Sequence, residues 1–271
     1  REETLEAARI ALEEVAPSRA LRLLRELPPF EEGSTDFEVL GLRARTLAMM
    51  GRLEEASEIL SSESRSLPTE LAVELAQWLE RLGRSAQAQA IAERHVEVPD
   101  RARVVLAQSR LSRGDPEHAA SIARMYVEET SSTSCRVRLL CLLSDAAVQR
   151  GRYEESLEWA NQAVDLASEN SKPMLLAQAH SRQGTAHGLS GFHETALVRH
   201  REAYREAREA GDVAGLPPYI LNVATAEHAS GDFGAPLEHY ASAAELCRQL
   251  GRDSARAGVL LNQANLLASL G

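Results

Sequence analysis

The feature that most constrains the fold of this chain is a glycine that returns at a nearly constant interval. The intervals between successive members of the series are 32, 31, 37, 40, 40 and 40 residues. The series consists of Gly51, Gly83, Gly114, Gly151, Gly191, Gly231 and Gly271. A period of this size is typical of proteins built from one repeated unit that stacks on its neighbours.

Small side chains accompany each glycine at fixed distances. Those seven residues before it are Ala44, Ala76, Ala107, Ser144, Gly184, Ala224 and Ala264. Those five residues after it are Ala56, Ala88, Ala119, Ser156 and Ala196, with Pro236 as the exception. Small residues at matched places on consecutive helices let the helix axes approach closely. Each unit is therefore predicted to be a helical hairpin, with the glycine ending its first helix in a left-handed conformation.

Composition supports helices and narrows the classes of partner. Alanine, leucine, glutamate and arginine dominate, and runs of strand-forming residues are missing, so we expect an all-α protein. The net charge of −10 argues against nucleic acid as a partner, because a polyanion would be repelled. No apolar run approaches the ~18 residues of a membrane span, so we expect no membrane partner. The three cysteines lack metal-binding spacing and indicate a reduced, cytoplasmic protein.

Three segments carry a recognisable pattern of small, turn and aromatic residues. They are GRYEESLEWANQAVDLA (151–167), GFHETALVRHREAYREA (191–207) and GDFGAPLEHYASAAELC (231–247). The chain thereby resembles a tetratricopeptide-repeat array, and its 40-residue units are similar to the longer repeats of kinesin light chain and of maltose-activator-like bacterial regulators. The resemblance implies a right-handed superhelical solenoid of about seven hairpins plus a lone final helix near 257–270.

This resemblance also sets the expected domain organisation. We expect one solenoid over 1–271, with shorter and less regular repeats in 1–136 and regular repeats of about 40 residues in 137–271. The first repeat is the least regular, because Val15 stands where the other repeats have glycine. The sequence begins with Arg1 rather than methionine, from which we expect it to be a piece of a longer protein.

A row of polar residues is predicted to line the inner wall of the array, which first helices form in such proteins. Two residues before each small position stand Leu142, Arg182, Asn222 and Asn262, and one residue after it stand Asp145, Thr185, Thr225 and Asn265. A carboxamide offers a donor and an acceptor together, so repeated asparagines suit the backbone of an extended peptide. Kinesin light chain has asparagines in a similar place, which is what the resemblance implies for Asn222 and Asn262. Arg182 would instead favour an acidic group or a C-terminal carboxylate.

Four histidines, His180, His187, His193 and His200, are crowded into one repeat. His193 aligns with Tyr153 and Phe233 of the neighbouring repeats, and His200 aligns with Tyr240. We interpret them as ring replacements in the hairpin core that hydrogen-bond to a backbone carbonyl or to Gln183. The alternatives are a zinc site, which would need convergent imidazoles, and a pH-responsive joint.

No motif for catalysis or for a cofactor is recognisable, so the chain is expected to be a non-catalytic interaction module without cofactor or metal. Its partner is expected to be a protein or peptide segment held in the groove. One alternative is a regulatory or sensor arm of a larger bacterial signalling protein that contacts an ATPase, a protease or a transcription regulator of the same polypeptide. A metal-dependent enzyme that uses the four histidines is the third hypothesis.

Overall fold

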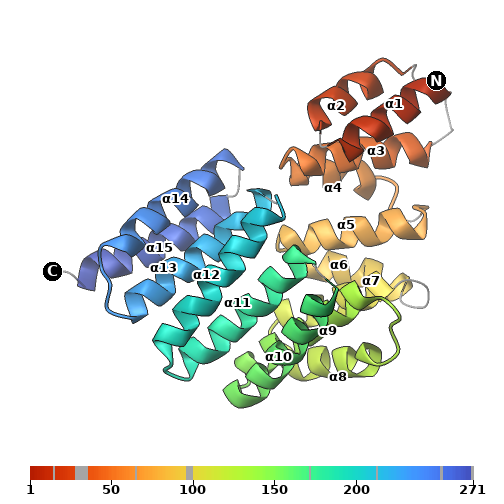
Figure 1. Ribbon diagram of the computed structural model, residues 1–271. Helices are drawn as coiled ribbons and strands as arrows, with labels where there is room; N and C mark the ends of the chain where they lie inside the picture. The colour runs from red at the N-terminus through yellow and green to blue at the C-terminus, as the bar shows by residue number, and fades with distance from the viewer. Residues whose placement is uncertain are drawn as a thin grey trace. The chain divides into compact units, whose positions relative to one another are not determined.

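The structure is a computed structural model that describes residues 1–14, 16–27, 36–64, 66–95, 100–170, 172–211, 213–250 and 253–269. Within these ranges it contains fifteen α-helices, one short 3-10 helix and no strand (Figure 1). The predicted all-α solenoid of helical hairpins is confirmed. The chain packs as two units, Arg1–Arg113 and Gly114–Gly271, called unit 1 and unit 2 below. The change of repeat length predicted at residue 137 lies inside unit 2, and the single solenoid stays a prediction.

Unit 1 contains three hairpins and one further helix. Its helices are α1 (Glu2–Glu13), α2 (Pro17–Arg25), α3 (Phe37–Met49), α4 (Leu53–Ser61), α5 (Thr69–Arg81), α6 (Ser85–Arg94) and α7 (Asp100–Ser112). The first helices α3, α5 and α7 each have 13 residues, whereas the second helices α4 and α6 have 9 and 10. Val15, which replaces the glycine of the first repeat, lies outside the described residues.

From α9 onward the helices of unit 2 are longer than those of unit 1. The helices of unit 2 are α8 (Pro116–Val127), α9 (Thr133–Gln149), α10 (Tyr153–Glu169), α11 (Pro173–Leu189), α12 (His193–Glu209), α13 (Leu216–Ala229), α14 (Ala235–Gln249) and α15 (Asp253–Ser269), with the 3-10 helix η1 at Val213–Gly215. Both helices of the hairpins α9–α10 and α11–α12 have 17 residues. The longer repeat interval therefore adds a turn or more to each helix. The lone final helix begins at Asp253, four residues earlier than 257, the start that the sequence predicts.

The recurring glycines close the first helices as predicted. Gly51, Gly83, Gly114, Gly151, Gly191 and Gly231 have φ between 71° and 86°. At five of these turns the next residue donates its N–H to a carbonyl five residues earlier, for example Arg152 to Ala147 at 2.9 Å. This bond is the mark of a Schellman cap, in which a residue without a side chain adopts the left-handed conformation at least cost. Gly271 lies outside the described residues.

The small side chains pack between the paired helices. Ala44, Ala76, Ala107, Ser144 and Ala224 are each 0% exposed, and so are their counterparts Ala56, Ala88 and Ser156. The hydroxyls of Ser144 and Ser156 lie 2.8 Å apart and share a buried hydrogen bond, which satisfies both polar groups. Ala264 of α15 is the exception, because it is exposed.

The first helices of unit 2 form a continuous row. Helix α9 contacts α11, α11 contacts α13, and α13 contacts α15, while the second helices α10, α12 and α14 each pack against the first helix that follows (Figure 1). The row brings together side chains that are one repeat apart in sequence. It supplies the surface on which the predicted polar positions lie.

Candidate functional site

Two of the predicted polar residues meet across the α9–α11 contact. The Arg182 guanidinium donates through Nη2 to Asp145 Oδ2 at 2.8 Å and through Nε to Oδ1 at 3.1 Å. Both side chains are partly buried, 30% and 27% exposed. The negative charge of Asp145 raises the pKa of the Arg182 guanidinium above its usual value. The carboxylate that we expected Arg182 to seek in a partner is therefore already supplied by Asp145 of α9, the preceding first helix.

The Asn222 carboxamide is anchored at one end. Its Nδ2 donates to the Ser181 hydroxyl of α11 at 3.1 Å. Among the described residues no donor reaches its Oδ1, so that oxygen stays free to accept a hydrogen bond. Thr185 and Thr225 donate their hydroxyls to carbonyls four residues earlier, of Ser181 and Leu221, at 3.0 and 2.9 Å. Each threonine oxygen keeps a lone pair for an N–H donor.

Of the remaining predicted positions, two have side chains that reach solvent and one has a buried side chain. Asn265 is exposed and Asn262 half-buried on α15, and neither side-chain amide has a hydrogen-bond partner among the described residues. Leu142 of α9 is 4% exposed, so the prediction that it points into the groove is wrong. A leucine at this position gains more by packing between helices than by facing water, whereas the longer, charged Arg182 at the equivalent place is partly buried and pairs with Asp145.

The histidine cluster lies in the hairpin α11–α12. His200 is 6% exposed, and its ring lies directly over Gly184, where a Cβ would come within 2.6 Å of Cε1. Burial lowers the pKa of His200 to about 4 and also lowers that of His180. His200 therefore fills the position that Tyr240 fills in the next hairpin, and its predicted place in the core is confirmed.

The hydrogen bonds expected for these histidines do not form as predicted. Nδ1 is buried without a partner among the described residues in His180, His193 and His200. Gln183, the expected partner, instead donates to Asn161 Oδ1 at 2.7 Å. Because Gly184 has no Cβ, the His200 ring packs directly against α11 at that position. His187 lies nearer the turn, where its ring meets Phe192 edge-on at a centroid distance of 6.2 Å.

The described residues offer little for reactive chemistry. No three of their His, Cys, Asp or Glu side chains are grouped to hold a metal ion. Burial raises the pKa of the Cys141 thiol to about 12, so a thiolate does not form there near neutral pH. No described helix is both long enough and apolar enough to cross a bilayer.

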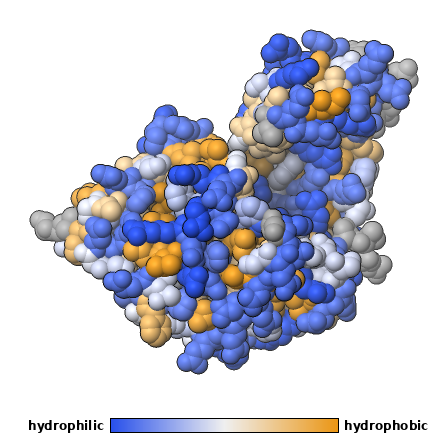
Figure 2. Space-filling model, in the orientation of Figure 1, coloured by the Kyte–Doolittle hydropathy of each residue, from blue (hydrophilic) through white to orange (hydrophobic). Residues whose placement is uncertain are grey.

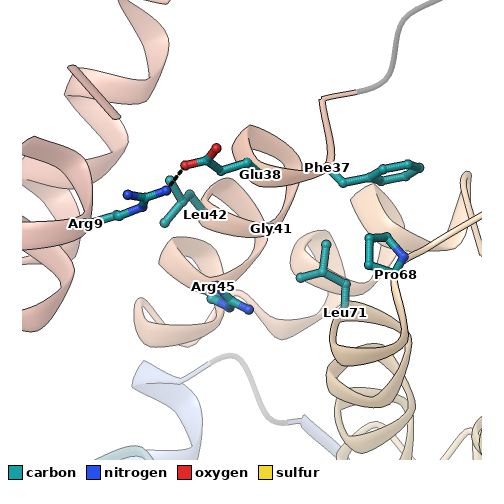
Figure 3. Close-up of a pocket in the computed structure, with 8 residues that line it drawn as sticks. All are labelled: Arg9, Phe37, Glu38, Gly41, Leu42, Arg45, Pro68 and Leu71. Atoms are coloured by element: carbon teal, nitrogen blue, oxygen red, sulfur yellow. Dashed lines mark hydrogen bonds and ion pairs between the residues drawn. The ribbon is translucent and has the colours of Figure 1, made fainter. Parts of the chain in front are cut away.

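Unit 1 holds a hollow that the sequence did not predict. It measures about 250 Å³ and lies among α1, α3 and the start of α5 (Figure 3). Its lining is Arg9, Phe37, Glu38, Gly41, Leu42, Arg45, Pro68 and Leu71. In Figure 3 the Arg9–Glu38 ion pair stands at one end, and Phe37 and Pro68 stand at the other. The hollow thus has an ion pair at one end and apolar side chains at the other.

The charges of this hollow are paired internally. Arg45 donates through Nε and Nη2 to Glu74 of α5, each at 2.9 Å, and this hydrogen bonding raises the pKa of Arg45. The rule that selected the polar row in unit 2 also selects Leu42, Arg45 and Glu74 when it is applied to α3 and α5. The rule therefore marks Leu42 and Arg45, two of the eight residues that line the hollow, but it does not predict the hollow itself.

Comparison with protein families gives one local match. Residues 137–170 match the model of the tetratricopeptide repeat. No curated protein matches the sequence. The family match covers α9 and α10, the hairpin with which the regular repeats begin, and together with the structural neighbours it supports a tetratricopeptide-repeat array.

Solved structures share the fold at low sequence identity. A Rap protein complexed with competence and sporulation factor is 12% identical with a TM-score of 0.67, over 99% of this chain and 88% of that one. NprR in complex with its cognate peptide NprX is 14% identical with a TM-score of 0.67, over 97% and 83%. A signal transduction ATPase with a tetratricopeptide repeat sensor, from Pyrococcus horikoshii, is 14% identical with a TM-score of 0.58, over 98% of this chain and 46% of that one.

Proposed function

We propose that this chain is a non-catalytic interaction module that binds an extended peptide along the first helices of unit 2. The observation that carries the proposal is the Asn222 carboxamide, whose Nδ2 is held by Ser181 while its Oδ1 is open. A fixed acceptor can take a peptide N–H without first losing side-chain freedom, so the row is preorganised for a ligand.

The polar row offers what a peptide backbone needs. Asn222, Thr185 and Thr225 present acceptor oxygens, and the amides of Asn262 and Asn265 supply donors as well. An extended backbone alternates N–H and C=O groups, so it can use both kinds of group whatever its side chains are. The opposite charges of Asp145 and Arg182 nearly cancel, so the pair adds a nearly neutral site to the row. A ligand carboxylate would have to displace Asp145 to reach Arg182.

The structural neighbours support a peptide as the ligand. The Rap protein and NprR were each crystallised with a bound factor or peptide. Asn222 and Asn262 also stand where the resemblance to kinesin light chain places asparagines. A partner segment from another protein would use the same groups as a free peptide.

The test is selection of peptides from a random library against the intact chain, followed by calorimetric titration. Asn222→Ala combined with Asn262→Ala should weaken a selected peptide at least about tenfold, or ~1.4 kcal/mol. Asn170→Ala at the end of α10 is the matched control and should leave affinity unchanged. Equal affinity of the double variant and the wild type would remove the proposal.

A second candidate function is a regulatory arm within a larger bacterial signalling protein. It is favoured by the likeness to the sensor of the Pyrococcus horikoshii ATPase, of which this chain spans 46%. In that case the row would contact a domain of the same polypeptide. The complete coding sequence decides, since a neighbouring ATPase, protease or DNA-binding domain would support this function and its absence would oppose it.

A further inference from the structure

The hollow of unit 1 has room for one amino-acid side chain. Its volume of about 250 Å³ lies below the ~300–1,000 Å³ of sites that enclose a whole small molecule. All the residues that line it belong to unit 1 (Figure 3). Figure 2 shows that hydrophilic residues predominate on the visible face of that unit. An apolar group of a ligand therefore finds more apolar contact inside the hollow than on that face.

The apolar part of the lining suits a ring. Phe37 is half-buried at the first turn of α3, and Pro68, which precedes α5, is exposed. Leu42 and Leu71 complete the apolar lining and are themselves buried. An incoming phenyl ring can pack edge-to-face against Phe37, which adds to the free energy gained by its burial.

Gly41 lines the hollow with backbone alone, because it has no side chain. A Cβ at this position would come within 2.8 Å of Leu71 Cδ2. The backbone of α3 therefore lies directly against Leu71 and forms part of the wall. A ligand in the hollow would touch this stretch of backbone, so the Gly41 amide is a local reporter of binding.

The charged groups around the hollow disfavour a charged ligand. Arg9 is paired with Glu38 and also donates to Glu6 at 2.9 Å, and Arg45 is paired with Glu74. An anionic ligand would have to displace one of these carboxylates. A cationic ligand would meet two guanidinium groups in the lining. An uncharged ligand avoids both costs.

One polar group of the lining stays open. Arg45 uses Nε and Nη2 to bind Glu74, whereas its Nη1 has no hydrogen-bond partner among the described residues. The N–H groups on Nη1 can donate to a carbonyl while the ion pair with Glu74 stays intact. A peptide places an uncharged carbonyl beside each side chain, so a peptide residue matches both the apolar lining and this donor.

We propose that the hollow of unit 1 binds an uncharged peptide residue with a large apolar side chain, phenylalanine above all. The ring packs against Phe37, Pro68 and Leu71, and a neighbouring backbone carbonyl of the peptide accepts a hydrogen bond from Arg45 Nη1. The site contains no residue of the polar row in unit 2, so it does not rest on the peptide binding proposed for that row.

The test is titration of the intact chain with N-acetyl-phenylalanine amide, followed by NMR. A ligand of this size in a well-fitting site should have a dissociation constant on the order of 1 mM. The Gly41 amide resonance should shift, and that of Gly184, a helical glycine of unit 2, should not. N-acetyl-alanine amide should bind at least about tenfold more weakly, because it lacks the ring. N-acetyl-phenylalanine, which ends in a carboxylate, should bind at least about threefold more weakly.

Two variants test the hydrogen bond from Arg45. Glu74→Gln leaves the Arg45 donors in place and should bind the phenylalanine amide at least as tightly as the wild type. Arg45→Met combined with Glu74→Gln removes the donors and should bind it about fivefold more weakly than Glu74→Gln alone. Phe192→Ala removes an exposed ring of unit 2 and is the control, which should leave affinity unchanged. The three probes on the wild type decide the question even where a variant does not fold.

Several results would overturn the proposal. One is a Gly41 resonance that does not move up to about 10 mM of the phenylalanine amide, roughly ten times the expected dissociation constant. Equal binding of the alanine and phenylalanine amides, or tighter binding of the carboxylate probe, would do the same. Shifts confined to the side-chain amides of Asn222 and Asn262 would assign the probe to the polar row, which would remove the site in unit 1 and leave the function proposed for unit 2 standing.

Discussion

Units 1 and 2 make the same contact between consecutive first helices with the charges reversed. In unit 1 Arg45 follows the small residue of α3, and Glu74 stands two residues before that of α5. In unit 2 the equivalent positions are Asp145 on α9 and Arg182 on α11. The repeat thus decides which positions meet, and the residues placed there decide the polarity of the surface.

The units also differ in what fills their cores. The core of unit 1 contains aliphatic side chains such as Leu60, Leu75 and Leu79, each at most 2% exposed. Unit 2 buries an imidazole, His200, whose Nδ1 has no partner among the described residues. An unsatisfied buried polar group lowers stability, so the hairpin α11–α12 should be the weaker place.

The largest expected difference between the two units is how much folding stability each loses in acid. Burial lowers the pKa of His200 from 6.5 to about 4. Below pH 6.5 the unfolded chain therefore binds a proton that the folded hairpin does not. Above pH 6.5 the protonation of His200 takes nothing from the free energy of unfolding. As the pH falls toward 4, that free energy decreases by up to roughly 3 kcal/mol.

The two tryptophans report the units separately, since Trp78 lies in unit 1 and Trp159 in unit 2. The variant Trp78→Phe keeps only Trp159, so its fluorescence follows the unfolding of unit 2. Denaturation at about pH 7 and pH 4.5, which brackets most of the His200 titration, should show a large loss in the free energy of unfolding of unit 2. His200→Leu should remove most of that loss, and Tyr240→Phe should not. Equal acid sensitivity of Trp159→Phe and Trp78→Phe would contradict the comparison.

A smaller difference is expected between two helical glycines. At Gly184 a Cβ would come within 2.6 to 2.8 Å of three atoms of the His200 ring, whereas at Gly41 it would come within 2.8 Å of a terminal methyl carbon of Leu71. A packed ring cannot yield as a flexible leucine end can. Gly184→Ala should cost about 2 kcal/mol. Gly41→Ala should be nearly neutral, because better helix propensity offsets a small shift of Leu71.

Urea denaturation of the two alanine variants measures this difference. The midpoint should fall clearly for Gly184→Ala and hardly move for Gly41→Ala. Similar midpoints would mean that the hairpin α11–α12 is not packed as tightly as the contact over Gly184 indicates.

The smallest effect concerns the reversed ion pairs. Asp145→Arg sets two guanidiniums together at a partly exposed place and should cost about 1 kcal/mol. Adding Arg182→Glu gives unit 2 the polarity of unit 1 and should restore most of the loss. A double variant no more stable than Asp145→Arg alone would show that the two positions are not equivalent between units.

The sequence predicted the parts of the fold that depend on periodicity. Glycine at 151, 191 and 231 indicated the left-handed turns, and the serines at 144 and 156 indicated the close helix contact. The sequence did not predict the Asp145–Arg182 pair, because 37 residues separate the partners and their meeting depends on how two hairpins stack. Nor did it predict the unpaired Nδ1 of His200, which depends on ångström-scale packing over Gly184. The polar row itself stays a prediction until a ligand is found.

The most direct test of the polar row uses the five asparagines of the chain, Asn161, Asn170, Asn222, Asn262 and Asn265. Their side-chain amide resonances can be followed by NMR while a selected peptide is added. We expect shifts at Asn222, Asn262 and Asn265 on the first helices and none at Asn161 on α10 or at Asn170, which caps the C-terminal end of α10. Shifts confined to Asn161 and Asn170 would contradict this expectation.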